Sequence, residues 1–396
     1  EGESIRAQLA IDAEQHFRQI VELRPNDPTA QAMLADAVYR VGAMSLRMGS
    51  HQDAAKRLSE AQEQWRSIFE ESPGHTDIQY RLTKACDKLG LTQQRLGEFE
   101  ESLQSIQMAV QLAEDLVRRF PEDAVFRDKL ADVYDHLRGL RDAMGPFSEK
   151  RKAISSVKIQ LEHLVKMQPE HTGYRRRLAE TYRRLGSLER ASGPGHYLFS
   201  HRKVDVSLYD DKLLEQARAI QQELVDAKQE LPWVAVDLSD TLNALANLWF
   251  HTANDGTYRE FDARSYEIVE TILHDYPDVE KLHLTLAQRL VDSAKRDMSR
   301  HEIALALSSF LKAAEHYRHY LSKRPQSLDI RIDLTAALIL AGRCSAAIES
   351  ETDSNDHIAA ARNELNNIKE TDSCPAHLQE SITQLERALD QSELTE

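Results

Sequence analysis

The chain has 396 residues, 41% of them hydrophobic and 29% charged, and its formal net charge is −15. This length exceeds one ordinary compact core, so several domains or a repeat array are expected. The composition excludes a disordered chain, and no run of 18 apolar residues is present that would span a membrane. The acidic balance also argues against general nucleic-acid binding, which requires a basic surface.

The start of the sequence, EGESIRAQLA, has neither an initiator Met nor a secretory signal pattern. We therefore expect a fragment of a longer protein, with a cytoplasmic location favoured. The three cysteines, Cys86, Cys344 and Cys374, are far apart and form no C-x-x-C pair. Three reduced structural thiols are expected rather than a disulfide framework or a zinc site.

Prolines recur at a fixed spacing, which indicates a stacked repeat array. Those at positions 25, 73, 121 and 169 are 48 residues apart, as are Pro277 and Pro325, and Pro232 lies between the two sets. Leucine occupies the ninth position after six of these seven prolines, and further apolar residues follow at helical spacing. Glycine recurs 24 residues after the proline, where a helix is expected to stop. Each repeat is therefore predicted to be a helical hairpin.

This spacing divides the chain into five parts. Residues 1–24 are predicted to be the second arm of a truncated repeat, 25–193 repeats 1 to 4 as far as the first arm of the fourth, 194–211 an inserted loop, 212–349 the remainder of repeat 4 with repeats 5 to 7, and 350–396 a degenerate last arm with a C-terminal capping helix. In the last part, the polar run SETDSND at 350–356 is expected to be a loop, and Pro375 to begin the final helix.

The segment LGLTQQRLGEFEESLQSIQMA (Leu89–Ala109) resembles a tetratricopeptide repeat, since Leu89, Gly90, Gly97 and Ser102 fall at the spacings of that family. The period of 48 exceeds the usual 34 of the family, which corresponds to about two extra helical turns in each arm. The resemblance implies an all-α, right-handed α-α solenoid of about seven elongated hairpins with one loop insertion. It also implies a general role as a protein-binding scaffold.

Two stretches, PEDAVFRDKLADVY and PEHTGYRRRLAETYRRLG, resemble the repeat regions that follow the catalytic domain in some bacterial multidomain serine/threonine kinases. This resemblance implies a regulatory or sensory role beside an attached kinase domain. The chain itself has no phosphate-binding glycine loop, kinase catalytic loop, G-x-S-x-G or H-E-x-x-H motif. It is therefore expected to be non-catalytic and without a cofactor, and a structural role in oligomer assembly is a third possibility.

Arginines and aspartates occupy matching positions in neighbouring repeats. Arg176, Arg183 and Arg190 lie 7, 14 and 21 residues after Pro169, and Asp128, Asp135 and Asp142 lie at the same offsets after Pro121. Packed helices are about 8–10 Å apart, a gap that an arginine side chain can cross. One interpretation is therefore a structural ladder of three inter-repeat ion pairs that fixes the register of the repeats.

The other interpretation is a partner-binding surface. Residues 150–203 carry 13 Lys and Arg against 4 Asp and Glu, a local charge of +9. The candidate contacts are the basic residues that the ladder does not use: Arg175, Arg177, Arg184, Arg202 and Lys203. By the resemblance, this face lines a concave groove, so the expected partner is a protein or peptide, with an acidic one favoured. A nucleic acid, a membrane or a small molecule is not expected.

Two further patterns are open to a functional interpretation. At the same offsets, other repeats carry apolar or small residues, which would form either an apolar channel beside the charged centre or buried packing; packing is favoured. They are Ala32, Tyr39, Leu46, Tyr80, Leu284, Val291, Met298, Ile332 and Ile339. The insertion contains His196, His201, Asp205, Asp210 and Asp211, but their spacing is not that of a metal site, so no metal is expected.

Overall fold

The computed structural model describes residues 2–144, 147–187, 209–229, 231–252, 255–348, 350–369 and 378–393. The described residues are almost entirely α-helical. The helices are α1 (Gly2–Leu23), α2 (Pro28–Arg47), α3 (His51–Glu71), α4 (Thr76–Leu96), α5 (Phe99–Arg119), α6 (Ala124–Met144), α7 (Phe147–Met167), α8 (Thr172–Gly186), α10 (Asp211–Asp226), α11 (Trp233–His251), α12 (Asp255–Asp275), α13 (Glu280–Ser299), α14 (Ile303–Lys323), α15 (Leu328–Ala347), α16 (Glu351–Lys369) and α17 (Gln379–Glu393).

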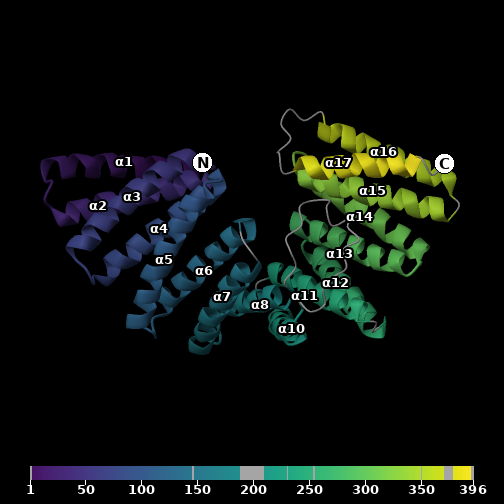
Figure 1. Cartoon of the computed structure of the whole chain (residues 1–396), viewed down its shortest axis with the longest axis horizontal. Helices are drawn as coiled ribbons and strands as arrows, with labels where there is room; N and C mark the ends of the chain where they lie inside the picture. Colours follow the sequence, from purple (N-terminus) through teal and green to yellow (C-terminus); the bar gives the residue numbers. More distant parts are fainter. Residues whose placement is uncertain are drawn as a thin grey trace. The chain divides into compact units, whose positions relative to one another are not determined.

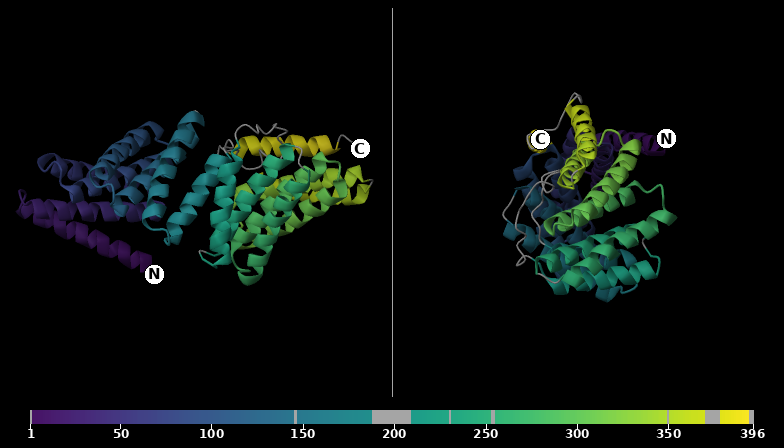
Figure 2. Two further views of the ribbon diagram at one scale, coloured as in Figure 1. Left: turned by 90° about the horizontal axis from the view of Figure 1, so that it is seen from below. Right: turned by 90° about the vertical axis from the view of Figure 1, so that its right-hand side faces the viewer.

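The helices form two compact units, residues 1–181 (unit 1) and 182–396 (unit 2), and the division falls within α8. In unit 1, α1 precedes the hairpins α2–α3, α4–α5 and α6–α7, and each helix packs against the next in the chain (Figure 1). In unit 2, the hairpins α11–α12, α13–α14 and α15–α16 stack in the same way, and α17 packs on α15 and α16 (Figure 2). The predicted all-α repeat architecture is thereby confirmed.

The repeat prolines lie in the turns before the first helices, and a capping side chain and glycines mark the helix ends. The side chain of Asp27 accepts hydrogen bonds from the amides of Thr29 and Ala30, which would otherwise be unsatisfied at the start of α2. Gly49 and Gly97 have a φ of 81°, in the left-handed region that favours glycine, and there the chain turns into the second helix. Gly256 differs, because it lies in the first turn of α12.

A second glycine series, 17 residues after the repeat proline, brings the two helices of a hairpin together. A Cβ atom on Gly90 would lie 2.5 Å from Cγ1 of Ile106, and Gly42, Gly186 and Gly342 meet a Leu or Ile in the same way. This close approach lets the hydroxyl of Ser102 donate a 2.7 Å hydrogen bond to the Gly90 carbonyl. Four hairpins thus share one recurring contact between a glycine and an aliphatic residue.

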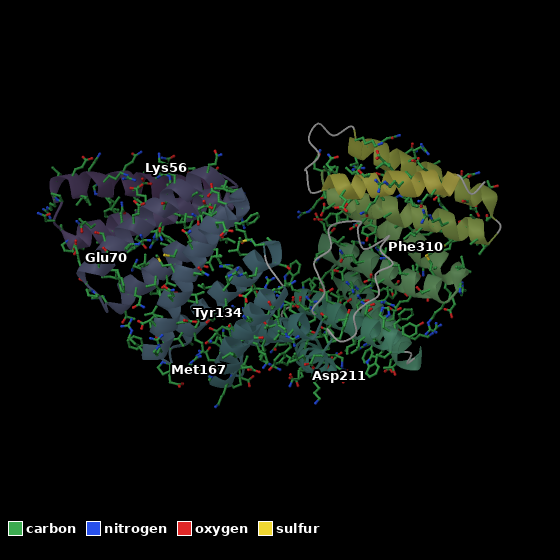
Figure 3. All side chains as sticks on the ribbon, in the orientation of Figure 1. Lys56, Glu70, Tyr134, Met167, Asp211 and Phe310 are labelled. Atoms are coloured by element: carbon green, nitrogen blue, oxygen red, sulfur yellow. The ribbon has the colours of Figure 1, made fainter. Side chains whose placement is uncertain are left out.

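Each unit has its own apolar core. In unit 1, Trp65, Leu82, Ile106 and Leu140 are buried in one cluster with Cys86. In unit 2, the largest cluster extends from α13 to α17 and includes the fully buried Phe310, which is labelled in Figure 3. Fourteen of the 20 residues of α15 are buried, because α14, α16 and α17 all pack against this helix. Cys86 and Cys344 are buried free thiols.

Two boundaries differ from the sequence prediction. The polar run at 350–356 is not a loop, since α16 begins at Glu351 and Ser354 donates a 3.0 Å hydrogen bond to the Gly342 carbonyl. A helix that packs through one face tolerates a polar first turn, so polarity alone misled the prediction. At the insertion, α8 ends at Gly186, Ser187 pairs with Tyr209 in an isolated antiparallel bridge, and Asp210 caps α10.

Candidate functional site

The first helices of successive hairpins in unit 1 carry most of the charged and aromatic side chains singled out by the sequence. We call the surface formed by α2, α4, α6 and the part of α8 in unit 1 the first-helix face. Cations located eight residues after the repeat proline reach back to the preceding first helix. Arg81 pairs with Asp36 at 2.8 Å, Lys129 with Asp87 at 2.5 Å, and Arg177 with Asp128 at 2.5 Å. An inter-repeat series of ion pairs therefore exists in unit 1.

The series differs from the predicted ladder in the arginine that it uses. Asp128 pairs with Arg177 rather than with the predicted Arg176, and Arg177 also binds Asp132 at 2.6 Å. Arg177 was expected to lack an acidic neighbour, and this expectation is wrong. When successive repeats are related mainly by translation, residues at the same distance from the repeat proline lie on the same side of their first helices. The residue that faces the preceding helix therefore lies at a different offset from the one that faces the following helix.

The other two ladder aspartates also have partners. Asp135 pairs with Arg138 on its own helix at 2.7 Å and takes part in a further interaction, and Asp142 pairs with Lys150 on α7 at 2.6 Å. Arg175, Arg176, Arg183 and Arg184 lie on α8, and each takes part in a further interaction. Arg190, Arg202 and Lys203 lie outside the described residues, as do His196, His201 and Asp205. The ladder and binding roles of these arginines on α8 and of Arg190, Arg202 and Lys203 stay predictions.

A buried carboxylate lies at the junction of α4 and α6. The side chain of Asp87 is fully buried, and it contacts Nζ of Lys129 at 2.5 Å and Nδ1 of His136 at 2.6 Å. Burial by itself would raise the pKa of Asp87, but the hydrogen bond with His136 and the charge of Lys129 lower it to about 2. Asp87 is therefore a carboxylate held in place by two neighbours from the next repeat, which is a structural arrangement.

Lys84 has a different environment, although it lies on the same face. Its ammonium nitrogen is 5.3 Å from the ring centroid of Tyr39 and 5.7 Å from that of Tyr80, within the range of cation–π contact. All three side chains are half-buried. Burial lowers the pKa of Lys84, an effect that the charge of Asp36 opposes. Lys84 makes no ion pair with any carboxylate in the part of the chain that the structure describes.

Lys84, Tyr39 and Tyr80 thus form a compact cluster, which we call the Tyr–Lys–Tyr cluster. The ring of Tyr80 also contacts Phe126 of the next repeat, with the two ring centroids 5.6 Å apart. The ammonium group of Lys84 has three N–H donors, and it forms no side-chain hydrogen bond with another residue in the described part of the chain. The sequence interpretation missed Lys84. The available signal was that Lys84 lies 11 residues after its repeat proline, where Asp36 and Asp132 carry the opposite charge.

The residues at the apolar offsets have different environments in the two units. In unit 1, Leu46 is buried, whereas Ala32, Tyr39 and Tyr80 keep part of their surface exposed. In unit 2, by contrast, the corresponding side chains are buried in the apolar core; these are Leu284, Val291, Ile332 and Ile339. The packing interpretation is therefore confirmed for unit 2, and a continuous apolar channel is excluded there.

The first helices of unit 2 are occupied by contacts with one another. Arg289 binds Asp240 at 3.2 Å, and Asn243 binds Asp292 at 2.8 Å. Arg296 donates a 2.6 Å hydrogen bond to Asn247 and also pairs with Asp262 on α12. Since these groups already have partners between successive hairpins, unit 1 offers the better candidate surface.

Among the described residues, no group of three or more His, Cys, Asp or Glu is arranged to hold a metal ion. No helix in the described ranges combines the length and the apolar character needed to cross a membrane.

No family model and no curated protein matches the chain. Solved structures do match it. BtubC (BKLC) from P. vanneervenii is 17% identical, with 68% of this chain and 92% of that chain covered and a TM-score of 0.48. A tetratricopeptide repeat protein from Parabacteroides merdae ATCC 43184 is 11% identical, with 90% and 98% covered and a TM-score of 0.46.

A third match is a signal transduction ATPase with numerous domains, which has a tetratricopeptide repeat sensor, from Pyrococcus horikoshii. It is 13% identical, with 98% of this chain and 50% of that chain covered and a TM-score of 0.47. Tetratricopeptide repeat proteins are therefore among the solved structures that the chain resembles. At these identities and TM-scores, the likenesses give no argument about function.

Proposed function

We propose that the chain is a non-catalytic scaffold that binds a protein or peptide partner through the first-helix face of unit 1. One observation carries the proposal: the ammonium group of Lys84 lies half-buried between two tyrosine rings and makes no ion pair within the described part of the chain. The neighbouring cations Arg81, Lys129 and Arg177 are held by aspartates. Lys84 is therefore positioned to bind an acceptor supplied by a partner.

The partner is proposed to present an acidic, extended segment. A carboxylate or a backbone carbonyl would accept from Lys84, and the faces of Tyr39 and Tyr80 would cover the aliphatic part of the same segment. Farther along unit 1, residues 150–181 on α7 and the start of α8 hold eight Lys and Arg against three Asp and Glu, so this stretch is positively charged. This local field would favour an acidic partner over a basic one.

The basic stretch itself remains part of the proposal as a second contact region. Its candidate residues are Arg175, Arg184, Arg202 and Lys203. Their role rests on the local density of positive charge, not on the environment of any single arginine. Arg177 is omitted from these candidates because Asp128 and Asp132 hold its guanidinium group.

The test is a selection of peptides from a displayed library that contains acidic and neutral extended sequences. Wild type is compared with Lys84→Met, which removes the charge and keeps the length of the side chain. The matched control is Lys56→Met, on the exposed side of the second helix α3 and labelled in Figure 3. Loss of a charge-assisted hydrogen bond predicts at least about a tenfold increase in Kd for Lys84→Met and no change for Lys56→Met.

Each outcome distinguishes the two contact regions. If Lys84→Met binds like wild type and Arg175→Glu loses acidic peptides, the basic stretch is the site and the Tyr–Lys–Tyr cluster is not. If wild type enriches no acidic peptide, the proposed partner class is wrong. A regulatory role beside an attached kinase domain is supported only by the sequence resemblance, and the sequence of a longer natural protein would test it.

A further inference from the structure

Three histidines meet at one end of the hairpin formed by α13 and α14. His283 lies in the first turn of α13, and His316 and His319 lie in the last two turns of α14. The Nδ1 atoms of His283 and His316 are 3.0 Å apart, and the rings of His283 and His319 stack with their centroids 3.8 Å apart. This arrangement is independent of the first-helix face of unit 1.

The Nδ1–Nδ1 contact limits the charge that the cluster can hold. At 3.0 Å, one nitrogen must donate a hydrogen and the other must accept it, so at least one of the two rings is not doubly protonated. A hydrogen bond from His283 to the backbone carbonyl of Pro277 occupies a further donor. If His283 and His316 were both protonated, their positive charges would repel each other across this short contact. His319 adds a third imidazole, stacked on the ring of His283.

The surrounding groups do not compensate this charge fully. The acidic groups near His316 are Glu315 on α14 and Glu270 on α12, and their effect on its pKa is smaller than that of burial, which lowers it. Glu280 on α13 is paired with Arg324. No carboxylate in the described ranges forms an ion pair with His283 or His316. Burial, followed by the charges of His319 and His316, lowers the pKa of His283 to about 4.

We propose that the His283–His316–His319 cluster is a proton-sensitive joint in this hairpin. At neutral pH, the uncharged rings hold the end of α14 against the start of α13. In mildly acidic solution, the cluster gains more positive charge than the contact can hold, and the two helix ends separate locally. The earlier turns of α14 are held by the apolar core around Ala306, Phe310 and Ala313, so the opening is confined to this end.

The sign of the effect follows from linkage. In the opened state, His283 would have its ordinary pKa, whereas in the closed state its pKa is near 4. Between these values the opened state binds more protons, so opening increases as the pH falls. For a single histidine with an ordinary pKa of about 6.5, the opening equilibrium at about pH 5 would rise by up to about 30-fold.

Native-state hydrogen exchange at about pH 7.4 and about pH 5, corrected for intrinsic exchange rates, tests the proposal. Wild type should lose protection at 280–285 and 316–323 at the lower pH, while the core of α15 keeps its protection. His283→Phe keeps an aromatic ring and removes the titration, so its protection there should be nearly independent of pH. His319→Gln should reduce the effect in part, and His357→Gln, on α16 outside the cluster, should behave like wild type.

Histidine NMR titration provides a second test that does not depend on the stability of the variants. The His283 imidazole should titrate well below the ordinary histidine range. Titration of His283 near its ordinary value would overturn the proposal. So would a pH-dependent loss of protection that is the same in wild type and His283→Phe.

Discussion

At the scale of single residues, the closest approach between the helices of a hairpin depends on glycine. Gly90 lies on α4 opposite Ile106 and Ser102 of α5, and a Cβ atom there would lie 2.5 Å from Ile106 Cγ1 and 3.2 Å from the Ser102 carbonyl oxygen. The second atom belongs to the backbone and cannot move away on its own. A methyl group at position 90 would therefore push the two helices apart.

Gly90→Ala is predicted to lower the free energy of unfolding by about 1–3 kcal/mol, because it overpacks a tight contact. Gly139→Ala is the matched control, since its Cβ would meet only Gln94 Nε2 at 3.9 Å. This control should be neutral, or stabilising by up to about 1 kcal/mol, because alanine favours the helix more than glycine does. Urea unfolding measures both, and equal effects would contradict the account of the contact.

Asp87→Asn is predicted to lower the free energy of unfolding at neutral pH by about 3 kcal/mol, because it leaves the nearly buried Lys129 without its counter-charge. The exposed Asp53→Asn should cost less than about 1 kcal/mol. The folded pKa of Asp87 is about 2, below its ordinary value, so its contribution is present above about pH 4 and is lost as the pH falls toward 2. A difference between wild type and Asp87→Asn that stays constant down to this range would contradict the prediction.

At the scale of the elements, the hairpins were predictable and their lateral pairing was not. The 48-residue period, the leucines and the glycines indicate where helices begin, end and pack, since these depend on local periodicity and on backbone conformation. The pairing of Asp128 depends on which flank of α8 faces α6, which the repeat spacing does not contain. Arg177 and Arg176 are adjacent in sequence but lie about 100° apart around the helix.

The polar start of α16 shows the same limit. Ser354 and Asp353 read as loop residues in isolation, yet they belong to a helix whose buried face begins with Ile358 and Ala361. Ser102 and Ser354 each lie 12 residues after a glycine, and each donates a hydrogen bond to the carbonyl of that glycine. The repeat period therefore predicts a helix at Ser354, although the surrounding run is polar. Repeat phase is thus a better guide to the boundary than local composition.

The pairing of α6 with α8 is tested by double-mutant cycles. Arg177 and Asp132 are partly exposed, so a coupling free energy of about 0.2–1 kcal/mol is predicted for the pair. The pair of Asp132 with Arg118 on α5 should show no coupling, since Arg118 pairs with Asp115 on its own helix. Zero coupling between Arg177 and Asp132 would mean that this contact contributes nothing to the register of the repeats.

At the scale of the whole molecule, many charged side chains form ion pairs with other side chains of the same chain. A local excess of Lys and Arg in a chain of net charge −15 suggested a basic patch, but Lys150, Lys152 and Arg177 from this stretch are paired with carboxylates of their own or neighbouring repeats. Composition therefore indicates where charge is dense, but not which charge remains for a partner. The environment of Lys84 depends on two tyrosine rings, one on α2 and one on α4, which composition does not contain.

The central claim, that a partner segment binds on the first-helix face of unit 1, is tested most directly by site-specific photo-crosslinking. A photoreactive phenylalanine derivative replaces Tyr80 in one variant and Lys56 in another, and each is irradiated with an acidic peptide selected on the wild-type chain. The account predicts crosslinking from position 80, competed by unlabelled peptide, and none from position 56. Crosslinking from position 56 alone, or equal yields from both positions, would contradict it.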